Sequence, residues 1–386
     1  MALLIIGTDG EDGVIGGRPA ELTTFFQQKG PWTPMPTQLT AGAQLAVLSQ
    51  SGCSLSFFDL ASGRRTDRID VLPEGHELCF DPVRRVVYAS HTYWSGHYLA
   101  HDAKGTEITA VDADTHRITR ILDLAPEHAP HALHLDPVSG LLYVSVEEGP
   151  RGPGGLVALD PETGQVKARH SADAPVPHWA VVRPDGRRAY TANKQTPYLS
   201  SVDLVEGGQV HRIAIAGSEG LALSPDGSLL FVATPTISVP ADPGAVYAVA
   251  VIDTASDTIV HSIPLSETPS PVHVTAAGKL LVGQWRLTAG AVGFPFRDGL
   301  LSVFDTSEYR LLAELEVGLG PINIVSTPDG ETAFVSNLQS GTVSVVDLTT
   351  LRVTETLEVD RGERLPAGRG IPNQGAHGLA FIPAAT

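Results

Sequence analysis

The chain has 386 residues, of which 39 are glycine and 29 are proline, while 18% are charged and 42% are hydrophobic. Disordered chains combine low hydrophobicity with high charge, and long helices avoid glycine and proline, so this composition argues against both. The formal net charge of −17, without a long lysine or arginine cluster, argues against nucleic acid and anionic membranes as partners. A small-molecule substrate is the expected partner, and the sequence does not indicate whether a protein partner exists.

The first 42 residues form a leader that fits none of the repeats described below. Leu3–Ile6 can add one strand, and Gly30–Pro36 is typical of an extended, turn-rich segment. The apolar start lacks a basic region and is too short for a secretory signal, and no later stretch approaches the ~20 apolar residues of a membrane span. The two cysteines, Cys53 and Cys79, are too few for a disulfide framework. We expect a cytoplasmic protein whose leader packs on the repeats.

A short phrase recurs along residues 43–386. Leu221–Gly227 (LALSPDG) and Ile324–Gly330 (IVSTPDG) each precede an apolar run, and Pro-Asp-Gly between two such runs is hairpin-turn chemistry. Weaker copies bring the number to seven: they lie at Leu78–Pro82, Leu133–Pro137, Val181–Gly186, around Gly278, and at Leu379–Pro383.

A second marker runs in phase with the first. Seven apolar strands end in an aspartate that we expect to cap the following turn: Asp59, Asp112, Asp160, Asp203, Asp253, Asp305 and Asp347. Four strands in a period of about 40–55 residues predict a propeller blade. The chain begins with strands two to four of a blade, at about 43–48, 53–59 and 64–71, and ends with one first strand at 376–383. We therefore predict an all-β, seven-bladed β-propeller in which the C-terminal strand completes the N-terminal blade and leaves no open sheet edge.

The best copies also carry a family resemblance. Val335–Asn337 (VSN), followed by Gly341–Asp347 (GTVSVVD), resembles the YVTN-type repeat of seven-bladed propellers, a superfamily that includes lactonase-like proteins and the heavy chains of quinoprotein amine dehydrogenases. The likeness covers residues ~43–386. It implies the fold, while propellers of this kind host unrelated chemistries.

The innermost strand of each blade starts at the mouth of the central channel. Alignment of the seven copies on the turn proline, six residues back, gives one mouth residue per blade: His76, His131, His178, Glu219, Ser270, Ile322 and His377. Four of these seven are histidine in a chain with 14 histidines among 386 residues, and ring closure makes their blades neighbours. Imidazole is the commonest ligand of transition metals, so we predict that His76, His131, His178 and His377 bind one. The set resembles, as a constellation only, the four histidines that hold iron in carotenoid-oxygenase propellers.

Further side chains are predicted around the metal. Glu219 is a candidate ligand or general base, and Glu77, Glu147 and Glu148 are candidates to orient the imidazoles. The segment 91–102 contains three histidines and three aromatic residues and can form a lid, with His91 as a possible catalytic group. Long loops at 235–246 and 286–298 should extend over the same face. The predicted substrate pocket consists of Trp94, His97, Glu147, Asn193, Lys194, Trp285 and Asn337. Trp179 fits the core between blades better than a pocket.

Three functions remain open at this stage. The first is a small-molecule metalloenzyme in which iron or copper is favoured over zinc, with redox or oxygenase chemistry. The second is a lactonase-like hydrolase or a lyase, as in the virginiamycin B lyases, another group of seven-bladed propellers; here a histidine paired with Glu219 or Glu147 acts as general base. The sequence has no Gly-x-Ser-x-Gly elbow, which disfavours a serine nucleophile. The third is a non-enzymatic binding scaffold.

Overall fold

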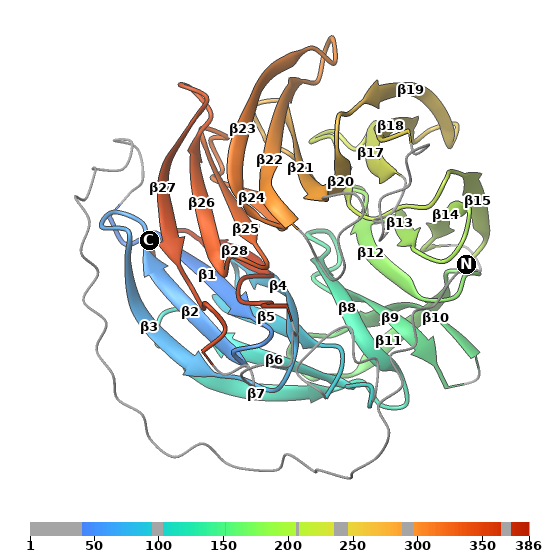
Figure 1. Cartoon of the computed structure of the whole chain (residues 1–386). Coiled ribbons are helices and arrows are strands. Elements are labelled where there is room, and N and C mark those ends of the chain that lie inside the picture. The colour runs from blue at the N-terminus through green and yellow to red at the C-terminus, as the bar shows by residue number, and fades with distance from the viewer. Residues whose placement is uncertain are drawn as a thin grey trace, which may run out of the picture. The chain divides into compact units, whose positions relative to one another are not determined.

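The computed structural model describes residues 41–94, 103–150, 152–205, 208–234, 246–287, 296–363 and 372–385. These residues form seven four-stranded antiparallel sheets arranged as the blades of a β-propeller (Figure 1). The predicted fold is confirmed. The leader lies almost entirely outside the described residues, so its packing stays a prediction. In the described part of the chain, no helix is long and apolar enough to span a bilayer.

The blades follow one another in chain order, each with its first strand innermost. Blade 1 contains β28 (Leu379–Ile382), β1 (Gln44–Ser49), β2 (Ser54–Asp59) and β3 (Arg64–Asp70). Blade 2 contains β4 (Gly75–Asp81), β5 (Val86–His91), β6 (Glu107–Asp112) and β7 (Ile118–Asp123). Blade 3 contains β8 (His128–Leu135), β9 (Leu142–Gly149), β10 (Gly152–Leu159) and β11 (Val166–Ser171). Blade 4 contains β12 (Pro177–Val182), β13 (Arg188–Asn193), β14 (Tyr198–Asp203) and β15 (Val210–Ala214).

The last three blades repeat the pattern. Blade 5 contains β16 (Leu221–Leu223), β17 (Leu229–Thr234), β18 (Ala248–Asp253) and β19 (Thr258–Pro264). Blade 6 contains β20 (Thr268–Val274), β21 (Lys279–Leu287), β22 (Phe296–Asp305) and β23 (Leu311–Leu319). Blade 7 contains β24 (Pro321–Ser326), β25 (Thr332–Asn337), β26 (Thr342–Asp347) and β27 (Arg352–Glu358).

The ring closes as predicted. β28 pairs antiparallel with β1, from Gln44 opposite Ile382 to Val47 opposite Leu379, so the two ends of the repeat region share blade 1. The strand is shorter than the predicted 376–383, but the backbone contact extends beyond it, because the His377 amide donates to Leu48 O at 2.8 Å. Closure pairs the inner strand that would otherwise expose its backbone groups.

The turn chemistry also follows the sequence. Gly186, Gly227 and Gly330 of the Pro-Asp-Gly turns have φ of 69°, 71° and 71°, the region in which glycine carries no steric penalty. Asp347 Oδ1 accepts the amides of Thr349 and Thr350 at 2.8 and 2.9 Å, and the same capping recurs after the third strand of other blades.

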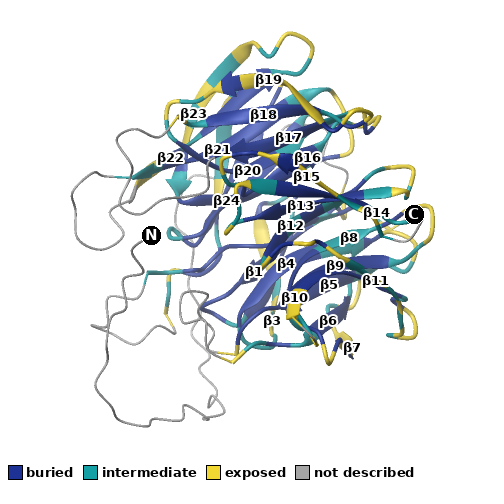
Figure 2. Cartoon of the chain, turned by 90° about the vertical axis from the view of Figure 1, so that its right-hand side faces the viewer, coloured by how far each residue is buried: buried dark blue, intermediate teal, exposed yellow. Residues whose placement is uncertain are grey.

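The core lies between the blades. Second and third strands such as β25 and β26 are almost wholly buried, whereas the exposed residues within strands lie mostly in fourth strands such as β3, β7 and β19 (Figure 2). Phe58 of blade 1, for example, packs with Phe334 and Val345 of blade 7. Trp179 packs against the core between blades 4 and 5, as expected.

Two predicted loops differ from the structure. His91 is the last residue of β5 and not the start of a loop. The predicted loop at 286–298 begins later, because β21 and β22 continue as a hairpin through the pair Leu287 and Phe296. In both cases the strand ladder continues past the point where the polar sequence suggested a turn. Residues 95–102 lie outside the described residues, and so does the predicted loop at 235–246 apart from its last residue.

Candidate metal centre

A bulge in the first strand aims each histidine of blades 2 to 4. In blade 2 the register with the second strand skips from Gly75 to Leu78, which leaves His76 and Glu77 outside the ladder. The same skip occurs between Pro130 and Leu133 and between Pro177 and Ala180, so His131 and His178 also lie in bulges. A β-bulge kinks a strand and redirects its side chains. The repeat therefore places the imidazoles at the same point of successive blades.

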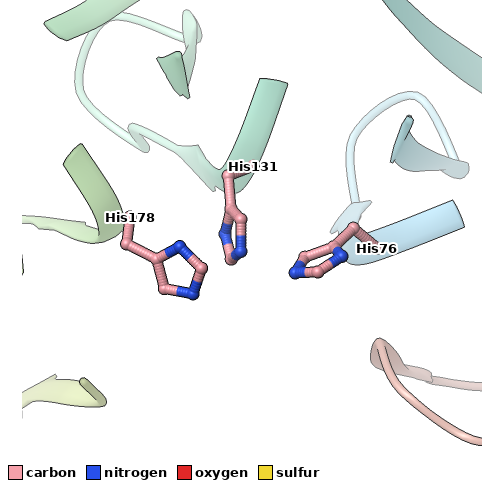
Figure 3. A group of neighbouring side chains, drawn as sticks. All are labelled: His76, His131 and His178. Carbon is pink, nitrogen blue, oxygen red and sulfur yellow. The ribbon is translucent and has the colours of Figure 1, made fainter. Parts of the chain in front are cut away.

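The imidazoles of the four predicted ligands lie side by side. The ring centroid of His131 is 4.0 Å from that of His76 and 3.6 Å from that of His178, and the centroid of His377 is 4.2 Å from that of His76. Figure 3 shows His76, His131 and His178 converging from three strands. The four side chains are buried, and His131 is 0% exposed.

Two groups of ligand atoms lie close enough to share a cation. One ligand atom each from His76, His131 and His178 falls within 4.8 Å of the others, and so does one each from His76, Glu77 and His377. The Gln50 side-chain amide hydrogen-bonds to Nδ1 of His76, so a residue of blade 1 contacts the ring of blade 2. The structure thus separates the predicted four-histidine set into a histidine triad and an adjoining His377–Glu77 pair.

Buried carboxylates surround the imidazoles. Glu74 Oε1 lies 3.5 Å from His76 Nδ1, and Glu77 Oε1 lies 3.3 Å from His377 Nδ1. His178 has two such neighbours: Glu219 Oε1 at 3.4 Å from Nε2 and Glu147 Oε1 at 4.0 Å from Nδ1. A carboxylate behind a histidine fixes the orientation of the ring and raises its basicity, and metal ligands commonly have this partner.

The second contacts of these carboxylates come from other blades. The Tyr93 hydroxyl donates to Glu147 Oε2, and Lys194 Nζ lies 3.0 Å from Glu219 Oε1. Asn323 Nδ2 donates to Glu77 Oε2 at 2.6 Å, from blade 7 to blade 2. Glu148, in contrast, is exposed and pairs with Lys104, so the structure does not bring it to an imidazole.

Burial favours the neutral form of His76, His131 and His377. It lowers the pKa of His76 and His131 well below the ordinary histidine value, with the neighbouring rings adding to the effect, and it lowers the pKa of His377 to about 3. Burial also raises the pKa of Glu77 well above its usual range, against the hydrogen bond from Asn323. Neutral imidazole is the form that binds a metal, so this lowering of the pKa favours metal binding.

The charges of the cluster fit a cation. Glu74, Glu147 and Glu219 are at most 4% exposed, and the amine of Lys194 pairs with Glu219. Glu219 Oε2 has no hydrogen-bond donor in the described part of the chain. A buried carboxylate is costly unless a cation or hydrogen bonds compensate it. A metal ion held by neutral imidazoles supplies positive charge at that place.

Other predicted site residues make contacts within their own blades. His91, Asn193 and Asn337 occupy equivalent places at the ends of second strands. Each contacts a hydroxyl in the third strand of its own blade: His91 contacts Thr109 at 2.8 Å, Asn193 contacts Ser200 at 2.9 Å and Asn337 contacts Ser344 at 3.0 Å. Gln284 makes the equivalent contact with Ser302. His91 Nδ1 lies 3.2 Å from Pro73 O, so both of its ring nitrogens are engaged by the blade.

The remaining pocket predictions divide in the same way. Trp285 is buried with Ile322 and Leu338, and its Nε1 donates to Pro321 O at 2.5 Å. Trp94 is 42% exposed, and His97 lies outside the described residues. The catalytic role of His91 and the pocket roles of Asn193, Trp285 and Asn337 stay predictions. Glu147 and Lys194 reach the cluster, through His178 and Glu219.

Four contacting residues, one of which is Asn323 of blade 7, were missed by the sequence reasoning. None of the other three occupies an aligned mouth position. Gln50 follows β1, Glu74 directly precedes β4, and Tyr93 lies two residues after β5. A glutamate two residues before an aligned histidine was a usable signal for Glu74. The contacts of Gln50 and Tyr93 depend on packing between blades and leave no local pattern.

Comparisons with known proteins support the fold. The sequence matches no protein-family model and no curated protein sequence. Among solved structures it is similar to Kuenenia stuttgartiensis hydrazine synthase, with a TM-score of 0.58, 19% identity, and coverage of 81% of this chain and 87% of that one. It is also similar to the dihydro-heme d1 dehydrogenase NirN in complex with DHE (TM-score 0.53, 18% identity, 88% and 66% covered) and to a functionally unknown protein from Desulfotomaculum acetoxidans (TM-score 0.61, 11% identity, 89% and 99% covered). These likenesses show the propeller fold, and membership of the YVTN-type superfamily stays a prediction.

Proposed function

We propose that this propeller is a metal-dependent enzyme acting on a small molecule, with His76, His131 and His178 as the ligands of one transition-metal ion. The observation that carries the proposal is the convergence of three buried imidazoles whose ligand atoms lie within 4.8 Å of one another. His377 and Glu77 stand beside the triad as a further ligand or as partners of a bound substrate.

The donor set favours a transition metal, such as iron, copper or zinc, over a hard cation. Imidazole suits all three metals, but hard cations such as magnesium and calcium prefer oxygen ligands. Three neutral ligands leave the charge of the metal uncompensated and leave coordination positions open, so a bound metal would supply Lewis acidity or redox chemistry. Redox or oxygenase chemistry is the version we propose, and similarity to propellers that include enzymes agrees with a catalytic role without identifying it.

The chain's own residues have defined tasks in this proposal. Glu74 orients His76, and Glu147 and Glu219 hold His178. Lys194, whose side chain is 28% exposed, is the charged group that joins this buried cluster to solvent through Glu219. Burial of the imidazoles excludes bulk water from the ligand atoms, which strengthens every charge interaction there.

One observation favours a second candidate, a hydrolase or lyase that needs no redox metal. Glu219 lies 3.4 Å from His178 Nε2, which is the arrangement of a carboxylate beside a histidine general base. Under this reading a chelator leaves activity intact and His178→Ala abolishes it. Under the metalloenzyme reading a chelator abolishes activity and the metal restores it.

Metal titration tests the main proposal without a known substrate. Cobalt(II), whose absorption reports its ligands, should bind the wild-type protein with a one-to-one stoichiometry, and His131→Ala should weaken binding by about 100-fold, because each ligand carries several kcal/mol of the affinity. His211→Ala removes an exposed histidine elsewhere on the surface and is the matched control. Equal affinities of the His131 and His211 variants would overturn the proposal.

A further inference from the structure

Three buried serines connect the histidine bulges of neighbouring blades. Ser90, Ser145 and Ser336 occupy equivalent places, one residue before the position of His91 and Asn337, and all three are 0% exposed. Each hydroxyl donates to the backbone carbonyl of the histidine in the next blade: Ser90 to His131 O at 2.7 Å, Ser145 to His178 O at 2.5 Å and Ser336 to His377 O at 2.7 Å.

Two of these hydroxyls also complete the bulge of their own blade. Ser90 Oγ accepts the amide of Glu77 at 3.1 Å, and Ser145 Oγ accepts the amide of Ala132 at 2.9 Å. Glu77 and Ala132 are the bulge residues that follow His76 and His131, and the bulge removes their amides from the strand ladder. A hydroxyl can donate one hydrogen bond while it accepts another, so one serine fixes both backbones.

The serines occur where the next blade carries a histidine. Blades 2, 3 and 7 have serine at this place and precede the blades of His131, His178 and His377. In blades 4, 5 and 6 the equivalent residues are Ala192, Ala233 and Gly283, and the next mouth residues are Glu219, Ser270 and Ile322. Blade 1, with Leu48 before His76, is the one exception. Since three blades form the fold with alanine or glycine there, the hydroxyl is not a requirement of the blade.

We propose that Ser90, Ser145 and Ser336 are positioning residues for the metal centre, which set where the imidazoles of His131, His178 and His377 stand by holding their backbones. The inference rests on the proposed function, and it assigns a task to residues outside the ligand set. Loss of one hydroxyl leaves the histidine carbonyl without its donor and, in blades 2 and 3, a buried bulge amide without its acceptor. The bulge then loses the contacts that define its direction.

The test uses Ser145→Ala, Ser90→Ala and Ser336→Ala in the full-length protein, with cobalt(II) as the probe. Each variant should bind cobalt about tenfold more weakly, as expected when a group that orients a ligand is lost, and should change the visible spectrum of the bound ion. Ser145→Thr, which keeps a hydroxyl, should restore much of the affinity and the spectrum. Ser344→Ala is the matched control, because Ser344 is an equally buried serine whose hydroxyl accepts from Asn337 within one blade at 3.0 Å.

Two outcomes would overturn the inference. Affinities and spectra within about twofold of wild type in Ser90→Ala and Ser145→Ala would do so, and so would an equal loss in Ser344→Ala, since the serines would then be merely structural. A readout without metal separates this failure from that of the proposed function. In the metal-free protein, the imidazole NMR signals of His178 should shift in Ser145→Ala and remain unchanged in Ser344→Ala, whether or not the wild type binds a metal. An absence of that shift would contradict the positioning role.

Discussion

Replacement of His91 by asparagine should make the protein less sensitive to acid. His91 is 2% exposed, with Nε2 at 2.8 Å from Thr109 Oγ1, and burial lowers its pKa to about 4. Blades 4 and 7 have Asn193 and Asn337 at the same place, and their amides donate to the corresponding serines. Asparagine therefore suits the site and does not titrate.

The magnitude follows from the difference in pKa between the folded and unfolded chain. An unfolded histidine has a pKa of about 6.5, so between pH 6.5 and 4 the unfolded chain takes up a proton that folded His91 refuses. The resulting stability is fully present above pH 6.5 and is lost as the pH falls. A pH of 5 lies about 1.5 units below the pKa of the unfolded histidine. At about 1.4 kcal/mol per pH unit, His91 alone lowers the free energy of unfolding by about 2 kcal/mol at that pH.

Guanidinium unfolding of the metal-free proteins at pH 7 and pH 5, followed by tryptophan fluorescence, measures this cost. Wild type should lose about 2 kcal/mol more free energy of unfolding between the two pH values than His91→Asn, because all other histidines are common to both. His91→Ala is the control: it should show the same reduced pH dependence but a lower stability at both pH values, since it loses the contact with Thr109. Equal losses in wild type and His91→Asn would refute the reasoning.

Three further predictions concern stability. Gly341→Ala should destabilise the protein by more than about 3 kcal/mol, because φ is +65° and a Cβ would lie 1.6 Å from Asp360 O. Gly140→Ala, where φ is +69° and no atom lies near the added Cβ, should cost about 1 kcal/mol. Urea denaturation measures both losses, and equal losses would contradict the account. Deletion of residues 372–386 removes β28 and opens blade 1, so circular dichroism should show loss of cooperative unfolding, and a native-like transition would argue against ring closure. A metal at 100 times its dissociation constant should stabilise the wild type by about 2.7 kcal/mol, which calorimetry detects as a higher Tm, and an unchanged Tm would count against the site.

The repeat architecture could be predicted because its signals are local. The Pro-Asp-Gly turns and the aspartate caps depend on the backbone conformations of a few adjacent residues, and Gly227 and Asp347 behave in the structure as their sequence context indicates. Alignment on those turns then brought His76, His131 and His178 to equivalent places, because identical turns fix identical registers. The same alignment also located Glu219, although Glu219 precedes the short strand β16.

The contacts between blades could not be read from the sequence. Asn323 and Glu77 are hydrogen-bonded across 246 residues, and no local pattern links them. His91 was interpreted as a catalytic loop residue because it begins a run rich in histidine and aromatic residues, but the ladder of β5 includes it and both of its nitrogens contact the blade. A polar residue at the end of a strand is consistent with a functional role and with a structural contact, and the sequence alone does not distinguish the two. The catalytic role of His91 stays a prediction.

The central claim is that the propeller holds a transition metal between its histidines. Elemental analysis of protein purified without chelators or metal-affinity resin tests it most directly. The account predicts close to one iron or copper ion per chain in the wild type and almost none in His131→Ala. Wild-type protein that contains no transition metal, and that takes up neither iron, copper nor zinc on titration, would contradict it.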